Sequence, residues 1–309
     1  MKKSDMVVEY EIINKLGEQG CFGEVFLAKD INIDRKIVVK EIPYFRINDQ
    51  SNFFNESQKL YKAKHPNIAE IYYAGFKDKI YENTDKKFSQ YHNKIVRHIC
   101  LSMAYYENGS LEQAIKNDKI KNEQVLKIFH NLLQGVHCIH SQGLIHLDLK
   151  PDNILFGKNM TPIISDFGVA QYLNKNGYTQ DPIMPKLLKS PESAKYILKG
   201  YEDVESQQTD IYQLGVIFYL ILKRSTFSHF NNEALNIITN NGIKDPKIEN
   251  LYNIIKNGSM FNLNDLNVDE KLIKIIKKML HINPDKRYDK ILPILNDLSK
   301  IKYGLWLLF

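Results

Sequence analysis

The first third of the chain alternates apolar and polar residues as half-buried β-strands do. Alternating runs separated by turn-forming residues predict strands at 10–13, 24–28, 37–42, 68–73 and 95–103. A helix is expected at 51–64, capped by Ser51 or Asn52. The polar stretch 77–94 separates the last two strands, and we expect it to form an extended hairpin or a mobile loop.

Helical periodicity replaces this alternation after the turn at 108–110. Between Glu123 and Ser141 the apolar side chains recur at a spacing that places them on one stripe of a helix. Similar stripes predict further helices at 210–222, 271–280 and 291–301. The two patterns together predict a β-rich unit followed by a larger helical one.

The change of pattern also suggests how the chain is divided. We expect a first lobe at about 10–105 and a second at about 108–301, joined near residue 106. Residues 1–9 form an N-terminal extension, and 302–309 form a short apolar tail that we expect to pack on the helical lobe.

Composition narrows the class of protein. With 309 residues, 43% hydrophobic and 25% charged, the chain is globular rather than disordered or collagen-like. Its three cysteines form no close pair, which argues against a disulfide framework or a structural zinc site and fits a reducing compartment. No apolar run approaches the roughly 18 residues of a membrane helix, and no secretory leader is visible. We therefore expect a cytoplasmic protein without a membrane span.

The net charge of +6 raises the question of a nucleic-acid partner. Only five of the 42 basic residues are arginine, the residue that makes bidentate contacts to bases and phosphates. A lysine-rich surface is the better interpretation, and no nucleic-acid partner is expected.

A glycine-rich segment at 17–25 lies between two predicted strands. Glycine lets backbone N–H groups approach a phosphate closely, although a plain tight hairpin would use the same residues. Lys40 ends the apolar run of the next strand, where it either reaches solvent or holds a polyphosphate. The second role needs a carboxylate to orient the lysine, and Glu56 on the following helix is a candidate.

A more specific pattern follows the long helix. His146 to Asn153 reads His-Leu-Asp-Leu-Lys-Pro-Asp-Asn, and Asp166-Phe167-Gly168 follows a short apolar run. Asp148, Asn153 and Asp166 thus offer carboxylate and amide oxygens from loops. Such oxygens suit Mg²⁺, which retains water and phosphate oxygens as its other ligands.

With these motifs, residues 10–301 resemble the eukaryotic-type protein kinase family. Further matching segments are 65–68 after the first helix, the hinge-like 103–111, Ser190-Pro191-Glu192, 210–215 and the 283–287 segment whose Arg287 would pair with Glu192. The resemblance implies an α+β bilobal kinase fold. Its N-lobe is a small antiparallel β-sheet with one main helix, and its C-lobe is larger and mainly helical.

The resemblance also implies the roles of individual residues. Lys40, paired with Glu56, would hold the α- and β-phosphates of ATP, while Asp148 would accept or orient the acceptor hydroxyl. Lys150 would neutralise charge on the transferred γ-phosphoryl group. Asn153 and Asp166 would hold Mg²⁺, with Mn²⁺ as a substitute. The ATP-binding set would be Leu16, Gly17, Gly20, Phe22, Gly23, Val25, Val38, Lys40, Met103, Ala104, Tyr105, Tyr106 and Leu155. Leu60, Ile71, His146 and Phe167 would stack into the internal spine of the family.

Two departures from the family pattern concern the phosphate loop and regulation. Gly17 precedes Gly20 by three residues rather than two, so the loop is expected to bulge while nucleotide binding survives. Leu147 replaces the arginine that usually pairs with a phosphorylated activation loop. We therefore expect activity without phosphorylation of the candidate sites Tyr172, Tyr178 and Thr179.

Two further departures concern the substrate. Lys150 is typical of serine/threonine kinases, whereas Pro185, seven residues before Glu192, resembles tyrosine kinases. A polar insertion at 198–208 lies where a protein substrate would dock, and it is either a specificity element or a plain surface loop. The leading hypothesis is an ATP-dependent kinase of protein Ser/Thr hydroxyls. The alternatives are a tyrosine or dual-specificity kinase, a pseudokinase that acts as an interaction module, and a small-molecule phosphotransferase.

Overall fold

The computed structural model describes residues 9–16, 24–44, 64–80, 91–167, 171–172, 190–193, 205–226 and 261–301. The packing of Cα atoms divides the chain into two compact units. The first comprises residues 1–64 and 69–106, and the second comprises residues 65–68 and 107–309. The predicted helix at 51–64 and the tail at 302–309 lie outside the described residues.

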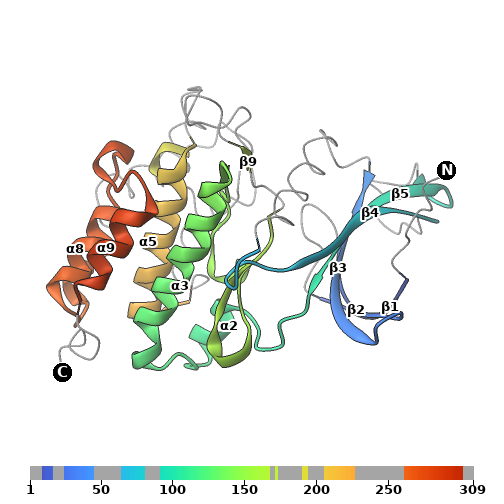
Figure 1. The fold of residues 1–309 in the computed structure, drawn as a ribbon, viewed down its shortest axis with the longest axis horizontal. Helices are drawn as coiled ribbons and strands as arrows, with labels where there is room; N and C mark the ends of the chain where they lie inside the picture. Colours follow the sequence, from blue (N-terminus) through green and yellow to red (C-terminus); the bar gives the residue numbers. More distant parts are fainter. Residues whose placement is uncertain are drawn as a thin grey trace. The chain divides into compact units, whose positions relative to one another are not determined.

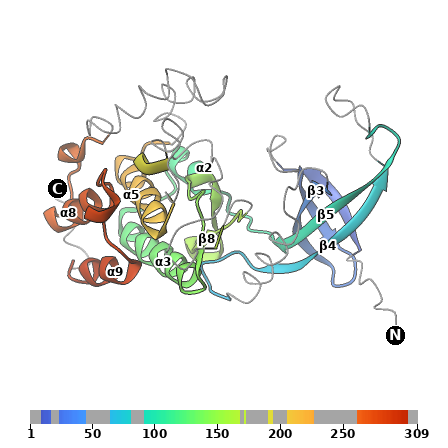
Figure 2. The same cartoon turned by 90° about the horizontal axis from the view of Figure 1, so that it is seen from above.

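The first unit is built on an antiparallel five-stranded sheet with the strand order β1-β2-β3-β5-β4. Figure 2 shows β3, β5 and β4 side by side in this order. The strands are β1 (Tyr10–Lys15), β2 (Glu24–Asp30), β3 (Arg35–Pro43), β4 (Ile71–Ile80) and β5 (Ile95–Ala104). Ala28, Ile37 and Val39 form a buried cluster on one face of the sheet, and the partly buried Tyr10 and Tyr72 pack against it. These strands confirm the β-rich unit that the alternating pattern predicts.

Strand β4 differs from its prediction at both ends. It begins at Ile71 rather than at Ile68, because Ile68 instead forms an isolated bridge with Ile164 in the second unit. It also runs on to Ile80, which pairs with Ile95 of β5. The first residues of the polar stretch 77–94 are therefore one arm of a hairpin, while residues 81–90 lie outside the described part.

The second unit is mainly helical, and Figure 1 shows helices α3, α5, α8 and α9 side by side. The helices of four residues or more that the structure describes are α2 (Leu111–Lys116), α3 (Asn122–Ser141), α5 (Gln207–Lys223), α8 (Glu270–Met279) and α9 (Ile291–Ser299). Short strands complete the unit: β6 (Leu144–Ile145) pairs with β9 (Gln171–Tyr172), and β7 (Ile154–Phe156) pairs with β8 (Pro162–Ile164). Helix α5 begins at Gln207, so the last two residues of the expected insertion at 198–208 are helical.

Helices α3 and α5 form the centre of this unit. The rings of Phe129 and Phe218 stack between them, with centroids 3.6 Å apart and planes 10° apart. Every residue of α5 from Thr209 to Ile221 is buried, as expected for a helix that is apolar nearly all round. Gly135 of α3 lets the chain approach closely, since a Cβ there would lie 2.8 Å from Ile164 Cδ1 and 3.1 Å from Asn67 O.

The two units together confirm the α+β bilobal class, with an antiparallel sheet in one unit and a helical second unit. Among the helices that the structure describes, none combines the length and the apolar character needed to cross a bilayer.

Candidate active site

The loop 146–153 connects β6 to β7 and ends in a short 3₁₀ turn, Pro151–Asn153. Asp148 stands at its centre and is held by two side chains. Lys150 Nζ and Asn153 Nδ2 each donate to Asp148 Oδ2 at 2.8 Å, and Asn153 Nδ2 also donates to the Asp148 carbonyl at 2.8 Å. These contacts give the Asp148 carboxylate one orientation in a half-buried setting.

His146 anchors the start of the loop and is fully buried. Its Nδ1 accepts from the Asp148 amide at 3.3 Å, and its Nε2 lies 3.0 Å from the Ser165 carbonyl. Both contacts fit the neutral ring with its proton on Nε2, since Nδ1 must accept and the carbonyl needs a donor. His146 thereby joins the loop to the segment that carries Asp166.

Asp210, in the first turn of α5, is completely buried and hydrogen-bonds to the backbone of the loop. Its Oδ2 accepts from the His146 amide and lies 2.8 Å from His140 Nε2, while its Oδ1 accepts from the Leu147 amide at 2.8 Å. Burial by itself would raise the pKa of Asp210. The hydrogen bond and charge of His140, with the hydrogen bond from the His146 amide, outweigh burial and hold that pKa below its usual value.

The segment after β8 lies against the same loop. The Ser165 amide and hydroxyl donate to the Asn153 carbonyl at 2.8 and 2.9 Å, and the rings of His146 and Phe167 are 4.8 Å apart. Asp166, between Ser165 and Phe167, has a φ of +57°, in the left-handed region that non-glycine residues rarely adopt. Asp166 and Asn153 thus come from adjoining backbone segments. Because Asn153 Nδ2 donates to Asp148, the side-chain oxygen Oδ1 of Asn153 is the atom that can bind a cation.

A second acidic group lies in this loop. Burial raises the pKa of Asp152, the negative charges of Glu112 and Asp148 raise it further, and Lys150 opposes them. The single cation Lys150 therefore lies close to two carboxylates of its own loop.

The first unit carries most of the expected nucleotide-binding residues. Val25 pairs with Lys40, and Val38 pairs with Met103, so the four side chains share one face of the sheet. Lys40 is buried, at 8% exposure, while Val25, Val38 and Met103 are half-buried. These four positions thus place the Lys40 cation beside apolar side chains.

The remaining expected binding residues lie near the sheet or in the second unit. Leu16 follows β1, and its amide donates to the Val25 carbonyl at 2.7 Å. At the end of β5 the Ala104 amide donates to the Glu70 carbonyl at 2.9 Å, and the Tyr106 hydroxyl accepts from the Glu70 amide at 3.2 Å. Tyr105 is half-buried, and Leu155 lies in β7 of the second unit, also half-buried.

Several expected residues lie outside the described part of the chain. They are Gly17, Gly20, Phe22, Gly23, Glu56, Leu60, Tyr178, Thr179 and Pro185. Of Tyr172 the structure describes the backbone alone.

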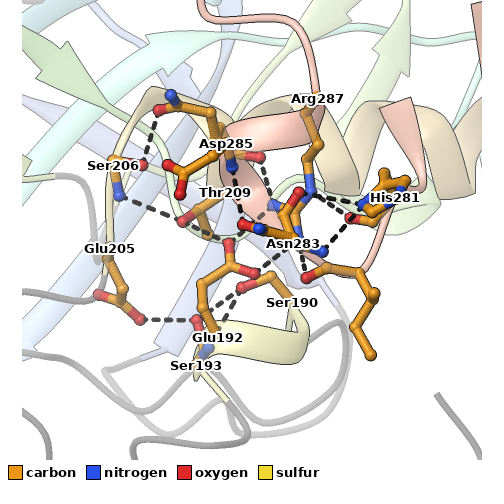
Figure 3. Close-up of polar contacts among 12 residues, drawn as sticks. Ser190, Glu192, Ser193, Glu205, Ser206, Thr209, His281, Asn283, Asp285 and Arg287 are labelled. Atoms are coloured by element: carbon orange, nitrogen blue, oxygen red, sulfur yellow. Dashed lines mark hydrogen bonds and ion pairs between the residues drawn. The ribbon is translucent and has the colours of Figure 1, made fainter. Parts of the chain in front are cut away.

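The expected pairing of Arg287 with Glu192 is confirmed (Figure 3). Arg287 Nη1 donates to Glu192 Oε1 at 2.8 Å, and Nη2 donates to Oε2 at 2.7 Å. Thr209 of α5 also donates to Glu192 Oε1, at 3.1 Å. In the same view Ser193 Oγ contacts Ser190 Oγ at 2.9 Å and donates to Glu205 at 3.3 Å. A buried polar network thus fixes residues 190–193 to α5 and to the segment before α9.

Sequence reasoning missed Gln213, which contacts the loop on both sides of Asp148. It lies three residues after Asp210, a spacing that places both side chains on one face of α5. A polar residue inside a nearly continuous apolar helix was the signal, because a buried amide must find hydrogen-bond partners.

Comparisons with known proteins agree with this arrangement. The protein kinase domain family matches residues 10–297. Serine/threonine-protein kinase ppk34 of Schizosaccharomyces pombe is 26% identical over 305 residues, which cover 91% of this chain and 80% of that protein. Serine/threonine-protein kinase cds1 of the same yeast is 28% identical over 296 residues (90% and 55%), and serine/threonine-protein kinase PknD of Protochlamydia amoebophila is 24% identical over 330 residues (96% and 30%). The match thus spans less than two thirds of the last two relatives.

Proposed function

The chain belongs to the protein kinase family, and we propose that it transfers the γ-phosphoryl group of ATP to serine and threonine hydroxyls of proteins. The observation that carries this proposal is the fixed carboxylate of Asp148, held by Lys150 and Asn153 in a loop that the buried Asp210 anchors. Phosphoryl transfer needs positioned charges rather than a reactive nucleophile, and this loop supplies them.

In the second unit, Asp148 takes the role of base. It would accept or orient the proton of the acceptor hydroxyl, while Lys150, 2.8 Å from Asp148, would neutralise charge on the phosphoryl group in transit. Asn153 and Asp166 would hold Mg²⁺, because an amide oxygen and a carboxylate on adjoining segments form a donor set that suits this cation. The bound Mg²⁺ would neutralise phosphate charge.

In the first unit, Lys40 would contact the α- and β-phosphates, with Glu56 as its partner. Val25 and Val38 would contact the adenine. The Ala104 amide already donates to Glu70, so the other backbone groups of 104–106 would read the edge of the base.

Two observations favour Ser/Thr hydroxyls as acceptors. Lys150 contacts the catalytic carboxylate directly, as the serine/threonine pattern of the family requires, and the relatives named above are serine/threonine-protein kinases. Pro185 keeps the tyrosine or dual-specificity alternative open. A pseudokinase would not need Lys40, Glu56, Asp148, Asn153 and Asp166 together, and the chain retains all five.

The test is transfer of labelled phosphate from Mg²⁺-ATP to a generic protein substrate and to the chain itself, with phosphoamino-acid analysis of the product. Asp166→Asn is the inactive variant, and Asp289→Asn, an exposed acid of the second unit, is its matched control. We expect phosphoserine and phosphothreonine from the wild type and from Asp289→Asn, and none from Asp166→Asn. ATP binding without transfer by the wild type would favour the pseudokinase, and phosphotyrosine alone would favour the tyrosine-kinase alternative.

A further inference from the structure

Gln213 of α5 is buried at 1% exposure and reaches the catalytic loop with both ends of its amide. Its Oε1 accepts from the Leu149 amide at 3.0 Å, and its Nε2 donates to the Leu147 carbonyl at 2.8 Å. One side chain on a rigid helix therefore bonds to the residues immediately before and after Asp148.

These two contacts act on the two peptide groups that meet at the Asp148 Cα. The Leu147 carbonyl belongs to the peptide before that atom, and the Leu149 amide belongs to the peptide after it. Fixing both planes fixes the φ and ψ of Asp148 and hence the direction of its Cα–Cβ bond. Asp210 cannot do this alone, because it bonds to the amides of His146 and Leu147, which both precede Asp148.

The backbone conformation of Leu147 shows why these hydrogen bonds to the loop are needed. Leu147 has a φ of +66° and no exposed surface. A branched side chain rarely adopts this left-handed conformation, which persists only when surrounding contacts impose it. The Asp210 carboxylate and the Gln213 amide supply those contacts, at the Leu147 amide and at its carbonyl.

We propose that Gln213 is a positioning residue that sets the direction of the catalytic Asp148. This inference rests on the proposed function, since it assumes that Asp148 acts on the acceptor hydroxyl. Gln213 itself touches the loop backbone, and its effect on the reaction passes through Asp148. Its loss should therefore lower kcat, while ATP binding, which depends on other residues, should change little.

The test compares Gln213→Met, which keeps the size of the side chain but removes both hydrogen bonds, with the wild type. Turnover, the KM for ATP and Tm are measured at a temperature well below the Tm of every variant. We expect kcat to fall by about tenfold or more, because a small misplacement of a catalytic group is costly, with the KM for ATP within about twofold. Ile217→Val, fully buried in the same helix, is the control: it should lower Tm and leave kcat unchanged. A kcat for Gln213→Met within about twofold of the wild type would overturn the proposal.

Gln213→Glu provides a second measurement if the methionine variant does not fold. Its carboxyl can still accept from the Leu149 amide, but only its protonated form can donate to the Leu147 carbonyl. The ratio of its kcat to that of the wild type should therefore fall as pH rises from about 6 to about 8.5, the range in which buried glutamates titrate. A ratio that stays close to one across this range would overturn the proposal. The wild type and Asp148→Asn separate the two claims. Absence of transfer by the wild type would refute the proposed function, whereas transfer that survives Asp148→Asn at the wild-type level would refute the role of Asp148 on which this inference rests.

Discussion

The Arg287 guanidinium and the Glu192 carboxylate form a bidentate ion pair, with contacts of 2.8 and 2.7 Å. The Arg287 side chain has no exposed surface, and that of Glu192 is 10% exposed. Arg287 also donates to the carbonyls of Gln208 and His281, at 2.9 and 2.7 Å. One side chain therefore joins three segments that lie far apart in the sequence.

Removal of one partner from this pair should be costly, because the other charge stays buried without compensation. We expect Arg287→Met to lower the free energy of unfolding by about 3–5 kcal/mol, measured by urea titration. Lys274→Met is the control, since Lys274 and Glu270 are exposed and 3.8 Å apart. A loss for Arg287→Met no larger than for Lys274→Met would contradict the structural role of the pair.

A substitution at Gly135 tests how closely α3 packs against residues 65–68 and β8. In Gly135→Ala the new Cβ would meet Ile164 at 2.8 Å and the Asn67 carbonyl at 3.1 Å. This overpacking should cost about 1–3 kcal/mol of unfolding free energy, although alanine is the better helix former. Gly157→Ala, whose nearest neighbour would be 3.6 Å away, should change it by less than about 0.5 kcal/mol. Equal effects in the two variants would show that the close approach at Gly135 is not required.

Asp210 should give stability a characteristic pH dependence. Its folded-state pKa lies below the unfolded value of about 3.9, so its ionised form stabilises the fold above that pH. This contribution is lost as pH falls through the folded-state pKa. Urea titrations at several pH values should therefore show a gap between wild type and Asp210→Asn that narrows below about pH 4. Asp289→Asn controls for the loss of a charge, and a gap that stays constant in acid would contradict the assignment.

Leu147 bears on regulation. A buried leucine cannot pair with a phosphate, so catalysis should not depend on phosphorylation of the activation segment. We expect the triple variant Tyr172→Phe, Tyr178→Phe and Thr179→Val to keep the kcat of the wild type. Phosphatase treatment of the wild type should also leave kcat unchanged. Loss of turnover in a triple variant that keeps its wild-type Tm would show that one of these hydroxyls is needed.

Hydrophobic periodicity predicted the strands and helices that bury one regular apolar face. The stripe from Glu123 to Ser141 became α3, and the alternation at 37–42 lies within β3. It misplaced the start of β4, because the bridge of Ile68 to Ile164 is a long-range contact that no local pattern encodes. Helix α2 was missed because its six residues are too short for a periodic signal.

The candidate site was predictable where motif residues carry the chemistry, as with Asp148, Lys150 and Asn153, which the structure brings together. The buried residues that hold this loop in place were not predictable from the sequence. Gln213 and His140 act through tertiary contacts, and their roles appear only when α3, α5 and the loop are placed side by side. Sequence reasoning thus identified the candidate catalytic residues, but not the buried residues that hydrogen-bond to their loop.

The central claim is that Asp148 acts on the acceptor in phosphoryl transfer. The most direct test measures phosphate transfer and ATP binding in one preparation of Asp148→Asn, beside the wild type. We predict transfer reduced by about 10²- to 10⁴-fold, the usual contribution of a positioned base, with the Kd for ATP unchanged. Transfer at the wild-type rate would contradict the account.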